Sequence, residues 1–166
     1  MSEVFTKAKP GQYLTFQLME EQYGVAIETV REINQFGDIT PVPRTPEYVK
    51  GVMNLRGKII PVVNLRIKFG MEAKNTTRDT CIIVIDTEIG QVGMIVDSVK
   101  EVVDLQEAQI EPSPVLGNQQ AMSFVRGMGK VENLVVILVD IVSAFSADQM
   151  GQMAQHTSGI STPEAA

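Results

Sequence analysis

The sequence predicts an all-β, mainly β fold arranged as two small β-barrels. Short β-prone segments follow one another closely with only brief helical segments between them, a pattern typical of barrels rather than of a βαβ sheet. An internal duplication is the second observation, since residues 24–33 match 93–102 in chemical class and 48–69 match 124–145 more loosely. Two copies are too few for a solenoid, which needs about three. A pair of similar subdomains is therefore expected.

The first subdomain is expected over residues 12–70, after a loose polar leader at 1–11. Partial alternation of apolar and polar residues predicts strands at 13–18 and 23–27, which form a hairpin. A further strand is expected at 30–33, because the segments around it are also β-prone.

Two short helices are predicted in this half. Thr45 can cap the first, Pro46 suits its first turn and Gly51 can end it. Asn64 can cap the second, and Gly70 can close it.

Between these helices, residues 58–63 are an apolar strand. Its Pro61 has no backbone N–H group, which predicts a position at a sheet edge or bulge.

The second half is expected to repeat these elements. A polar linker at 71–78 separates the halves, and the second subdomain spans 79–146. The repeat predicts strands at 80–85, 91–96, 99–105 and 134–139, a loop at 106–123, and short helices at 124–127 and 140–145. Residues 147–166 are rich in Gln, Ser, Thr, Gly and Pro, so a disordered tail is expected.

Composition excludes several classes of protein. A net charge of -6 with 14 scattered basic residues argues against nucleic-acid binding. Cys81 is the single cysteine, which excludes a disulfide framework and indicates a reducing compartment. No segment approaches the ~18 apolar residues of a membrane span, so we expect a soluble, cytoplasmic protein.

Candidate catalytic residues are few. His156 is the only histidine and falls in the expected tail, so neither a Ser-His pair nor a zinc cluster can be assembled. The stretch 127–130 suggests a phosphate loop, but Phe124 stands where that motif requires glycine. We expect no enzymatic activity, no cofactor and no metal.

Two carboxylate pairs recur at equivalent places in the duplication. Glu28 with Glu32 in the first copy corresponds to Asp97 with Glu101 in the second. A catalytic dyad has no reason to be duplicated, whereas a solvated sheet edge has, so a surface role is favoured. A hydrolase that uses these carboxylates is the alternative from a different class.

Arg56 is the most informative single position. Its counterpart in the second copy is Glu132, so the copies diverge in charge here while their apolar positions agree. An unduplicated arginine in a surface turn serves either solubility or recognition, and the residues alone leave both open.

Two runs of sequence carry a family resemblance. They are Gly-Val-Ala-Ile-x-x-Val-Arg-Glu-Ile at 24–33 and Tyr-Val-Lys-Gly-Val-Met-Asn-Leu-Arg-Gly-Lys-Ile-Ile-Pro-Val-Val-Asn-Leu at 48–65. Together with 93–99 and 134–141, they resemble the CheW family of chemotaxis coupling proteins over residues 12–146. The C-terminal tail lies outside the family pattern.

This resemblance implies one CheW-like domain of two packed five-stranded, SH3-like barrels with short connecting helices. It also implies an adaptor, recruited to membrane receptor arrays, that joins chemoreceptors to the histidine kinase CheA. A receptor helical tip would lie in the groove between the barrels, at positions corresponding to Val30, Glu32, Gly51 and Arg56. The regulatory domain of the kinase would dock at a barrel end, placed coarsely around Val96, Val99, Val102 and Val103.

Two further alternatives stay open. One is an adaptor of a non-flagellar chemosensory pathway, and the other is a small-ligand sensor that binds in the groove between the barrels.

Overall fold

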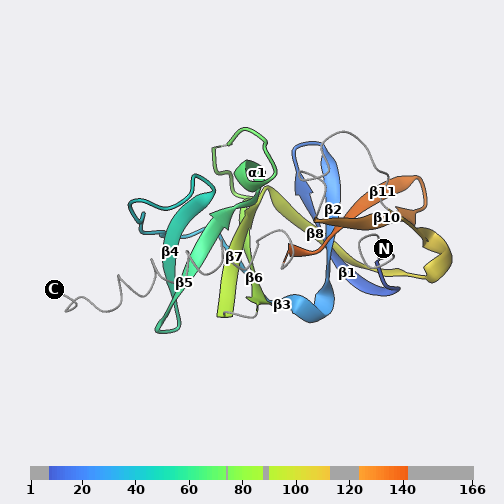
Figure 1. The fold of residues 1–166 in the computed structure, drawn as a ribbon, viewed down its shortest axis with the longest axis horizontal. Helices are drawn as coiled ribbons and strands as arrows, with labels where there is room; N and C mark the ends of the chain where they lie inside the picture. The colour runs from blue at the N-terminus through green and yellow to red at the C-terminus, as the bar shows by residue number, and fades with distance from the viewer. Residues whose placement is uncertain (1–7, 74, 88–89, 113–123, 142–166) are drawn as a thin grey trace.

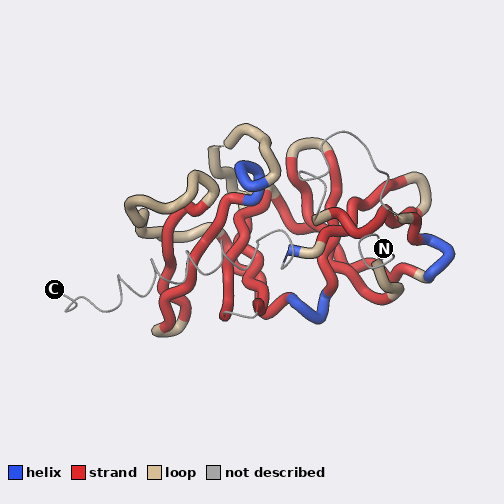
Figure 2. The backbone as a smooth tube through the Cα atoms, viewed as in Figure 1, coloured by secondary structure: helices blue, strands red, loops and turns tan. Residues whose placement is uncertain are grey.

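The computed structural model describes residues 8–73, 75–87, 90–112 and 124–141 (Figure 1). Strands dominate this part of the chain (Figure 2), so the all-β class is confirmed. In order they are β1 (Gly11–Leu18), β2 (Glu21–Ala26), β3 (Val30–Gln35), β4 (Val49–Leu55), β5 (Lys58–Asn64), β6 (Cys81–Thr87), β7 (Gly90–Val96), β8 (Ser98–Leu105), β9 (Ile110–Glu111), β10 (Val125–Val131) and β11 (Leu134–Val139). In the described part of the chain the named helical elements are α1 (Leu65–Lys68) and the 3₁₀ turns Ile27–Thr29 and Glu107–Gln109. Within these ranges no helix is long and apolar enough to cross a membrane.

The strands form two sheets. The six-stranded sheet has the order β8-β1-β2-β11-β10-β9, and β9 is only two residues long. The five-stranded sheet has the order β3-β6-β7-β5-β4. Figure 1 shows them side by side, with the five-stranded sheet on the left and the six-stranded sheet on the right.

The strand orders confirm the duplication. If β1, β2 and β3 are matched with β6, β7 and β8, and β4 and β5 with β10 and β11, the five-stranded order becomes β8-β1-β2-β11-β10. This is the order of the larger sheet without β9.

Each sheet, however, combines strands from both copies. The β1–β2 hairpin joins β8, β10 and β11, whereas the β6–β7 hairpin joins β3, β4 and β5. The sheets therefore do not follow the expected division into 12–70 and 79–146. Hydrogen-bonded pairing depends on edge geometry and not on distance along the chain, so two similar units can exchange hairpins and form the same ladders.

Equal pairing registers support this account. The exchanged hairpins join their new sheets through parallel pairs, in which Gly24 lies opposite Leu138 and Gly93 lies opposite Val62. The two pairs are equivalent, since Gly24 matches Gly93 and Val62 matches Leu138 in the sequence repeat.

The chain crosses between the sheets at two equivalent points. The 3₁₀ turn Ile27–Thr29 leads from β2 in the larger sheet into β3 in the smaller one. Asp97 leads from β7 back into β8. Glu28 and Asp97 hold the same position in the two copies, so each crossover carries one carboxylate.

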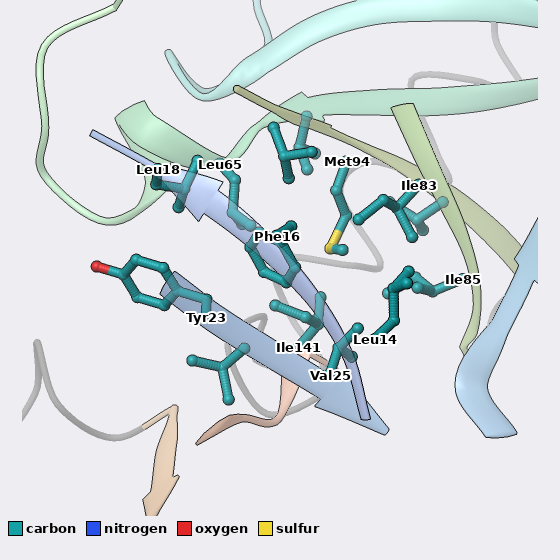
Figure 3. Packing of buried hydrophobic residues seen from close by; sticks show 14 of the residues in the cluster. Leu14, Phe16, Leu18, Tyr23, Val25, Leu65, Ile83, Ile85, Met94 and Ile141 are labelled. Carbon is teal, nitrogen blue, oxygen red and sulfur yellow. The ribbon is translucent and has the colours of Figure 1, made fainter. Parts of the chain in front are cut away.

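Buried apolar side chains form one large cluster between the sheets and a smaller one for each sheet. Figure 3 shows the large cluster, which includes Leu14, Phe16, Leu18, Tyr23, Val25, Leu65, Ile83, Ile85, Met94 and Ile141. Because both sheets contribute to it, separating them would expose these side chains to water. The two sheets therefore stabilise one another.

One short helix expected from the sequence is a turn instead. The Val49 N–H donates to the Pro46 carbonyl oxygen at 2.9 Å, and β4 begins at Val49. The corresponding helix expected at 124–127 is likewise replaced, since β10 begins at Val125. In both segments the residues pair as strands, and this pairing supplies a ladder of hydrogen bonds.

The other short helix is confirmed as α1. The Asn64 side-chain oxygen accepts a hydrogen bond from the Ile67 N–H at 3.3 Å, and Gly70 follows the helix with φ of 83°. Several expected elements lie wholly or partly outside the described residues: the leader at 1–11, the loop at 106–123, the helix at 140–145 and the tail at 147–166.

Pro61 does not mark a sheet edge, because β5 lies between β7 and β4. Opposite it, Val52 exchanges both of its backbone hydrogen bonds with Thr40, at 2.8 and 2.9 Å. The missing N–H of Pro61 therefore costs no bond on the β4 side. The expected irregularity is present nearby as a register shift between Val49 and Gly51.

Candidate partner-binding site

Two residues expected at the receptor face, Glu32 and Arg56, contact each other. Glu32 lies on β3 and Arg56 at the tip of the β4–β5 hairpin, and β3 and β4 are the opposite edges of the five-stranded sheet. Arg56 Nη1 donates to Glu32 Oε2 at 2.5 Å, and Nη2 donates to Oε1 at 2.8 Å. This bidentate salt bridge links the two edges of the sheet.

The hairpin turn orients Arg56. Arg56 and Gly57 both have positive φ, 53° and 88°, which is the backbone of a type I′ turn. The Asn54 side-chain oxygen accepts a hydrogen bond from the Gly57 N–H at 2.8 Å and holds the turn closed. The Arg56 side chain stays 73% exposed, whereas that of Glu32 is 17% exposed.

Positive charge surrounds the salt bridge. Hydrogen bonding from Arg56 holds the pKa of Glu32 below its usual value, and the same bond raises the pKa of Arg56. Arg31, Lys58 and Leu55 line the same open depression, which has a volume of about 440 Å³. Arg31 is itself paired with Asp86, with Nη2 3.3 Å from Oδ2. Three cations and two carboxylates leave a small excess of positive charge on this surface, which favours a partner that carries carboxylates.

The other two expected receptor positions offer little surface. Val30 is half-buried at the start of β3 and packs against the large core cluster. Gly51 is buried on β4 with φ of 151°, and a Cβ there would lie 2.1 Å from the Thr40 carbonyl oxygen. Gly51 therefore allows the close approach of Thr40 and has no side chain to present.

The expected kinase positions differ widely in exposure. Val96 is 1% exposed and belongs to the large core cluster, so it has no surface to offer a partner. Val99 and Val103 are half-buried. Val102, at 46% exposed, is the one member of this set with a large free apolar surface.

Other exposed apolar residues were not anticipated. On the six-stranded sheet, Leu134 and Val135 accompany Val102. On the five-stranded sheet, Ile33 and Ile59 hold the positions equivalent to Val102 and Val135. The apolar run at 134–139 could have predicted the exposed residues of β11. Successive side chains of a strand point to opposite faces, so an unbroken apolar run places apolar side chains on the outer face as well as the inner one.

The Glu32–Arg56 salt bridge has no equivalent on the other sheet, because the corresponding residues are Glu101 and Glu132. Glu101 is exposed, as expected for a surface edge, and Thr15 holds its backbone. The Thr15 hydroxyl donates to the Glu101 carbonyl oxygen at 2.7 Å and accepts from its N–H at 3.0 Å. The two sheets thus present different charges at equivalent places.

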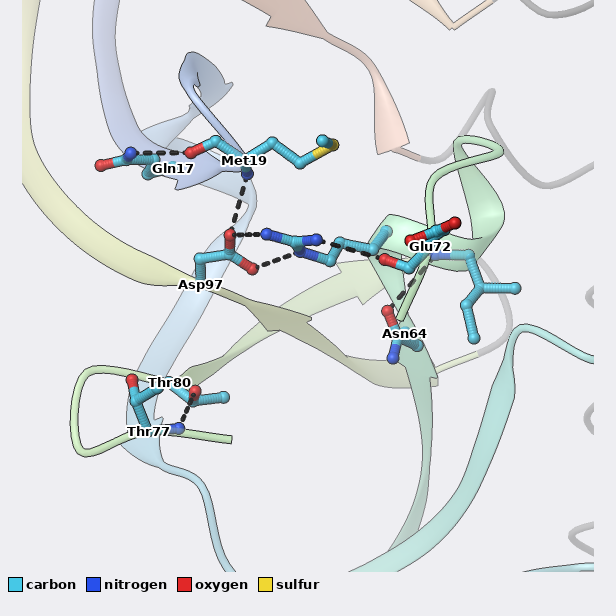
Figure 4. Close-up of polar contacts among 9 residues, drawn as sticks. Gln17, Met19, Asn64, Glu72, Thr77, Thr80 and Asp97 are labelled. Carbon is cyan, nitrogen blue, oxygen red and sulfur yellow. Dashed lines mark hydrogen bonds and ion pairs between the residues drawn. The ribbon is translucent and has the colours of Figure 1, made fainter. Parts of the chain in front are cut away.

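A second bidentate salt bridge lies at the crossover between β7 and β8 (Figure 4). Arg66 Nε donates to Asp97 Oδ1 at 2.8 Å and Nη2 to Oδ2 at 2.5 Å, and both side chains are 12% exposed. Asp97 Oδ2 also accepts from the Met19 N–H in the β1–β2 turn, at 2.8 Å. Asp97 was expected at a solvated edge, but it instead joins α1 of one sheet to a turn of the other.

The described residues contain no group of three or more His, Cys, Asp or Glu side chains placed to hold a metal ion. Cys81 is a free, half-buried thiol that donates to the Asp79 carbonyl oxygen at 3.2 Å. The prominent surface features are a charged depression and exposed apolar side chains. Charged depressions and exposed apolar side chains are features by which proteins bind partners.

The fold and these surfaces define a duplicated, two-sheet β-protein. The family model of the CheW-like domain matches residues 12–149, and the chain belongs to this family. It is 36% identical over 139 residues to the chemotaxis protein CheW of Klebsiella aerogenes, covering 84% of each chain. It is 33% identical over 138 residues to the chemotaxis protein CheW of Rhizobium meliloti, covering 83% of this chain and 89% of the relative. The crystal structure of the scaffolding protein TtCheW from Thermoanaerobacter tengcongensis matches with a TM-score of 0.76 and 35% identity, over 84% of this chain and 95% of that one.

Proposed function

We propose that the chain is a non-enzymatic adaptor that couples transmembrane chemoreceptors to the histidine kinase CheA in chemotaxis. Membership of the CheW-like family supports a scaffold role in this process. The observation that carries the proposal is the Glu32–Arg56 salt bridge, because it occurs on one sheet only and stands in a positively charged depression. A duplicated protein with one unduplicated charged site can distinguish two partners.

The receptor tip is assigned to the surface around Glu32 and Arg56. A helix that lies against apolar residues gains affinity from its buried face, and charges at the rim set its register. Leu55 lines the depression and supplies apolar surface beside the two charges. Val30 and Gly51 contribute by shaping the strands that carry this surface.

The kinase regulatory domain is assigned to the six-stranded sheet. Val102 is the exposed member of the expected set on β8, and Leu134 and Val135 are exposed on β11 of the same sheet, with β1 and β2 between these strands. Val99 and Val103 support it from below, since both are half-buried. An adaptor with its two partners on different sheets would hold them at a fixed geometry, because the sheets share one core.

Coupling requires more than tethering. The adaptor can shift the kinase between states only if it binds one of them more tightly. Signalling assemblies add many weak contacts, so each interface is expected to be modest in size. The protein would act in the cytoplasm at membrane receptor arrays, and a non-flagellar chemosensory pathway would use the same surfaces.

A hydrolytic use of the duplicated carboxylates has less support. Glu32 is engaged by Arg56 and Asp97 by Arg66, so two of the four are already paired with guanidinium groups. General acid or base catalysis needs a carboxyl that is free to exchange protons with substrate.

Sedimentation of the purified protein with CheA and receptor cytoplasmic fragments tests the proposal. We expect wild-type protein to pellet with receptor and kinase, and Arg56→Glu to lose the receptor-dependent pellet while it still binds the kinase. Arg78→Glu is the matched control, because it makes the same charge change at another exposed position. Pelleting that survives Arg56→Glu would move the receptor face elsewhere, and no association with either partner would overturn the adaptor role.

A further inference from the structure

Two cavities occupy equivalent places at the two crossovers. Four of their lining residues match pairwise in the sequence repeat: Ala26 with Ile95, Glu28 with Asp97, Arg126 with Lys50, and Asp140 with Asn64. The volumes differ greatly, however. The cavity at Asp97 measures about 40 Å³ and the cavity at Glu28 about 300 Å³.

The small cavity is filled by a guanidinium group of the chain itself. Arg66 lines it and makes the bidentate salt bridge to Asp97 described above. Burial of both groups strengthens this bond, because surrounding protein replaces water that would screen the charges.

In the large cavity the carboxylate of Glu28 has no guanidinium bonded to it, because the guanidinium that lines this cavity, that of Arg126, faces Asp140. The residue that corresponds to Arg66 in the sequence repeat is Val142, which has no polar side chain and lies beyond the described residues. Arg126 faces Asp140, with Nε 3.5 Å from Oδ2. Within the described part of the chain the Glu28 carboxylate has neither a hydrogen bond nor an ion pair, and it is exposed to the cavity and solvent.

We propose that the cavity at Glu28 binds a guanidinium group from outside the chain, in the place that Arg66 takes at Asp97. A guanidinium offers two parallel N–H donors that match a carboxylate. The volume of about 300 Å³ is at the lower end of the range for small-molecule sites, and Lys9 on its rim can pair with a carboxylate of the ligand. The ligand is therefore free arginine or an arginine side chain of a partner. This inference does not depend on the adaptor role.

NMR titration of the full-length protein with L-arginine tests the proposal. We expect shifts of the Thr29 amide and the Ile85 methyl groups, which line the large cavity, and none at the Ile95 methyl groups, which line the filled one. Glu28→Gln should weaken binding about tenfold or more, since a hydrogen bond to a charged group is worth about 1.5–3 kcal/mol. Glu101→Gln is the matched control, because Glu101 is exposed and lies outside the cavity.

Further ligands identify the source of the guanidinium. Tighter binding of free arginine than of a capped Gly-Arg-Gly peptide would indicate a small molecule, and the reverse would indicate a partner side chain; both support the proposal. Three results would overturn it: no shifts with arginine, equal affinity in Glu28→Gln, or equal affinity for L-lysine, which has no guanidinium.

Discussion

The guanidinium group of Arg56 and the carboxylate of Glu32 form a bidentate salt bridge between the two edges of the five-stranded sheet. The residues lie 24 positions apart in the chain. Both were expected at the receptor face from family resemblance, and the structure shows that they are also partners of each other. A variant of either residue therefore changes two groups at once.

Exchanging the two charges separates these roles. The double variant Glu32→Arg with Arg56→Glu can form the same salt bridge in reverse, so we expect its melting temperature to exceed that of Arg56→Glu alone. If the receptor reads the sign of the exposed charge, receptor pelleting should stay lost. Restored pelleting in the double variant would instead mean that the salt bridge acts only by holding the sheet.

Stability should depend on the protonation of Glu32. In the folded protein the hydrogen bond from Arg56 lowers the pKa of Glu32 below its ordinary value of 4.5. The contribution of the ionised carboxylate to the free energy of unfolding is therefore present above pH 4.5, and it disappears as the pH falls through the pKa of the folded protein. We expect wild type to melt above Glu32→Gln at pH 7 and the gap to close in acid. Since the Arg56 side chain is 73% exposed, water screens the salt bridge and the gap should be small. A gap that widens in acid would contradict this assignment.

Arg66→Ala should destabilise the fold strongly. It leaves Asp97 without its guanidinium partner at a site where both side chains are 12% exposed, and loss of one member of a buried pair costs about 3–5 kcal/mol. Urea denaturation measures the change, with Arg78→Ala as an exposed control. A loss below about 1 kcal/mol would show that water replaces the arginine at little cost.

Adjacent residues of β11 test the strand assignment. Val136 is fully buried and Val135 is 51% exposed, so the same substitution should destabilise the fold strongly at Val136 and only slightly at Val135. We expect Val136→Asp to unfold the protein by burying an unpaired charge, and Val135→Asp to change the free energy of unfolding by about 0.5 kcal/mol or less. Circular dichroism during thermal melting distinguishes the two. Similar melting of both variants would refute the assignment of faces.

Substitution of two glycines with positive φ, Gly51 and Gly57, distinguishes the cost of a steric clash from the cost of backbone strain. Gly57 has φ of 88° and open space around it, whereas a Cβ at Gly51 would lie 2.1 Å from the Thr40 carbonyl oxygen. Gly57→Ala should cost about 1–2 kcal/mol, from the left-handed backbone alone. Gly51→Ala should cost clearly more, because backbone must move. Equal losses in urea denaturation would mean that β4 shifts freely away from Thr40.

Local patterns determined much of this protein from sequence alone. Apolar alternation predicted the strands, Asn64 and Gly70 predicted α1, and the two matching blocks predicted the duplication. Each of these depends on residues close together in the chain or on direct comparison of two segments. The divergence of Arg56 from Glu132 was likewise visible without coordinates.

Only the tertiary structure decided which copy each hairpin joins. Two similar units have similar strand edges, so a sequence repeat cannot distinguish pairing within a copy from pairing between copies. It also separated Val96 in the core from Val102 on the surface, although both are valines in β-prone runs. The pairing of Arg66 with Asp97, and the open cavity at Glu28, arise where the exchanged strands cross. Such contacts depend on how distant segments pack, and no local pattern in the chain records that.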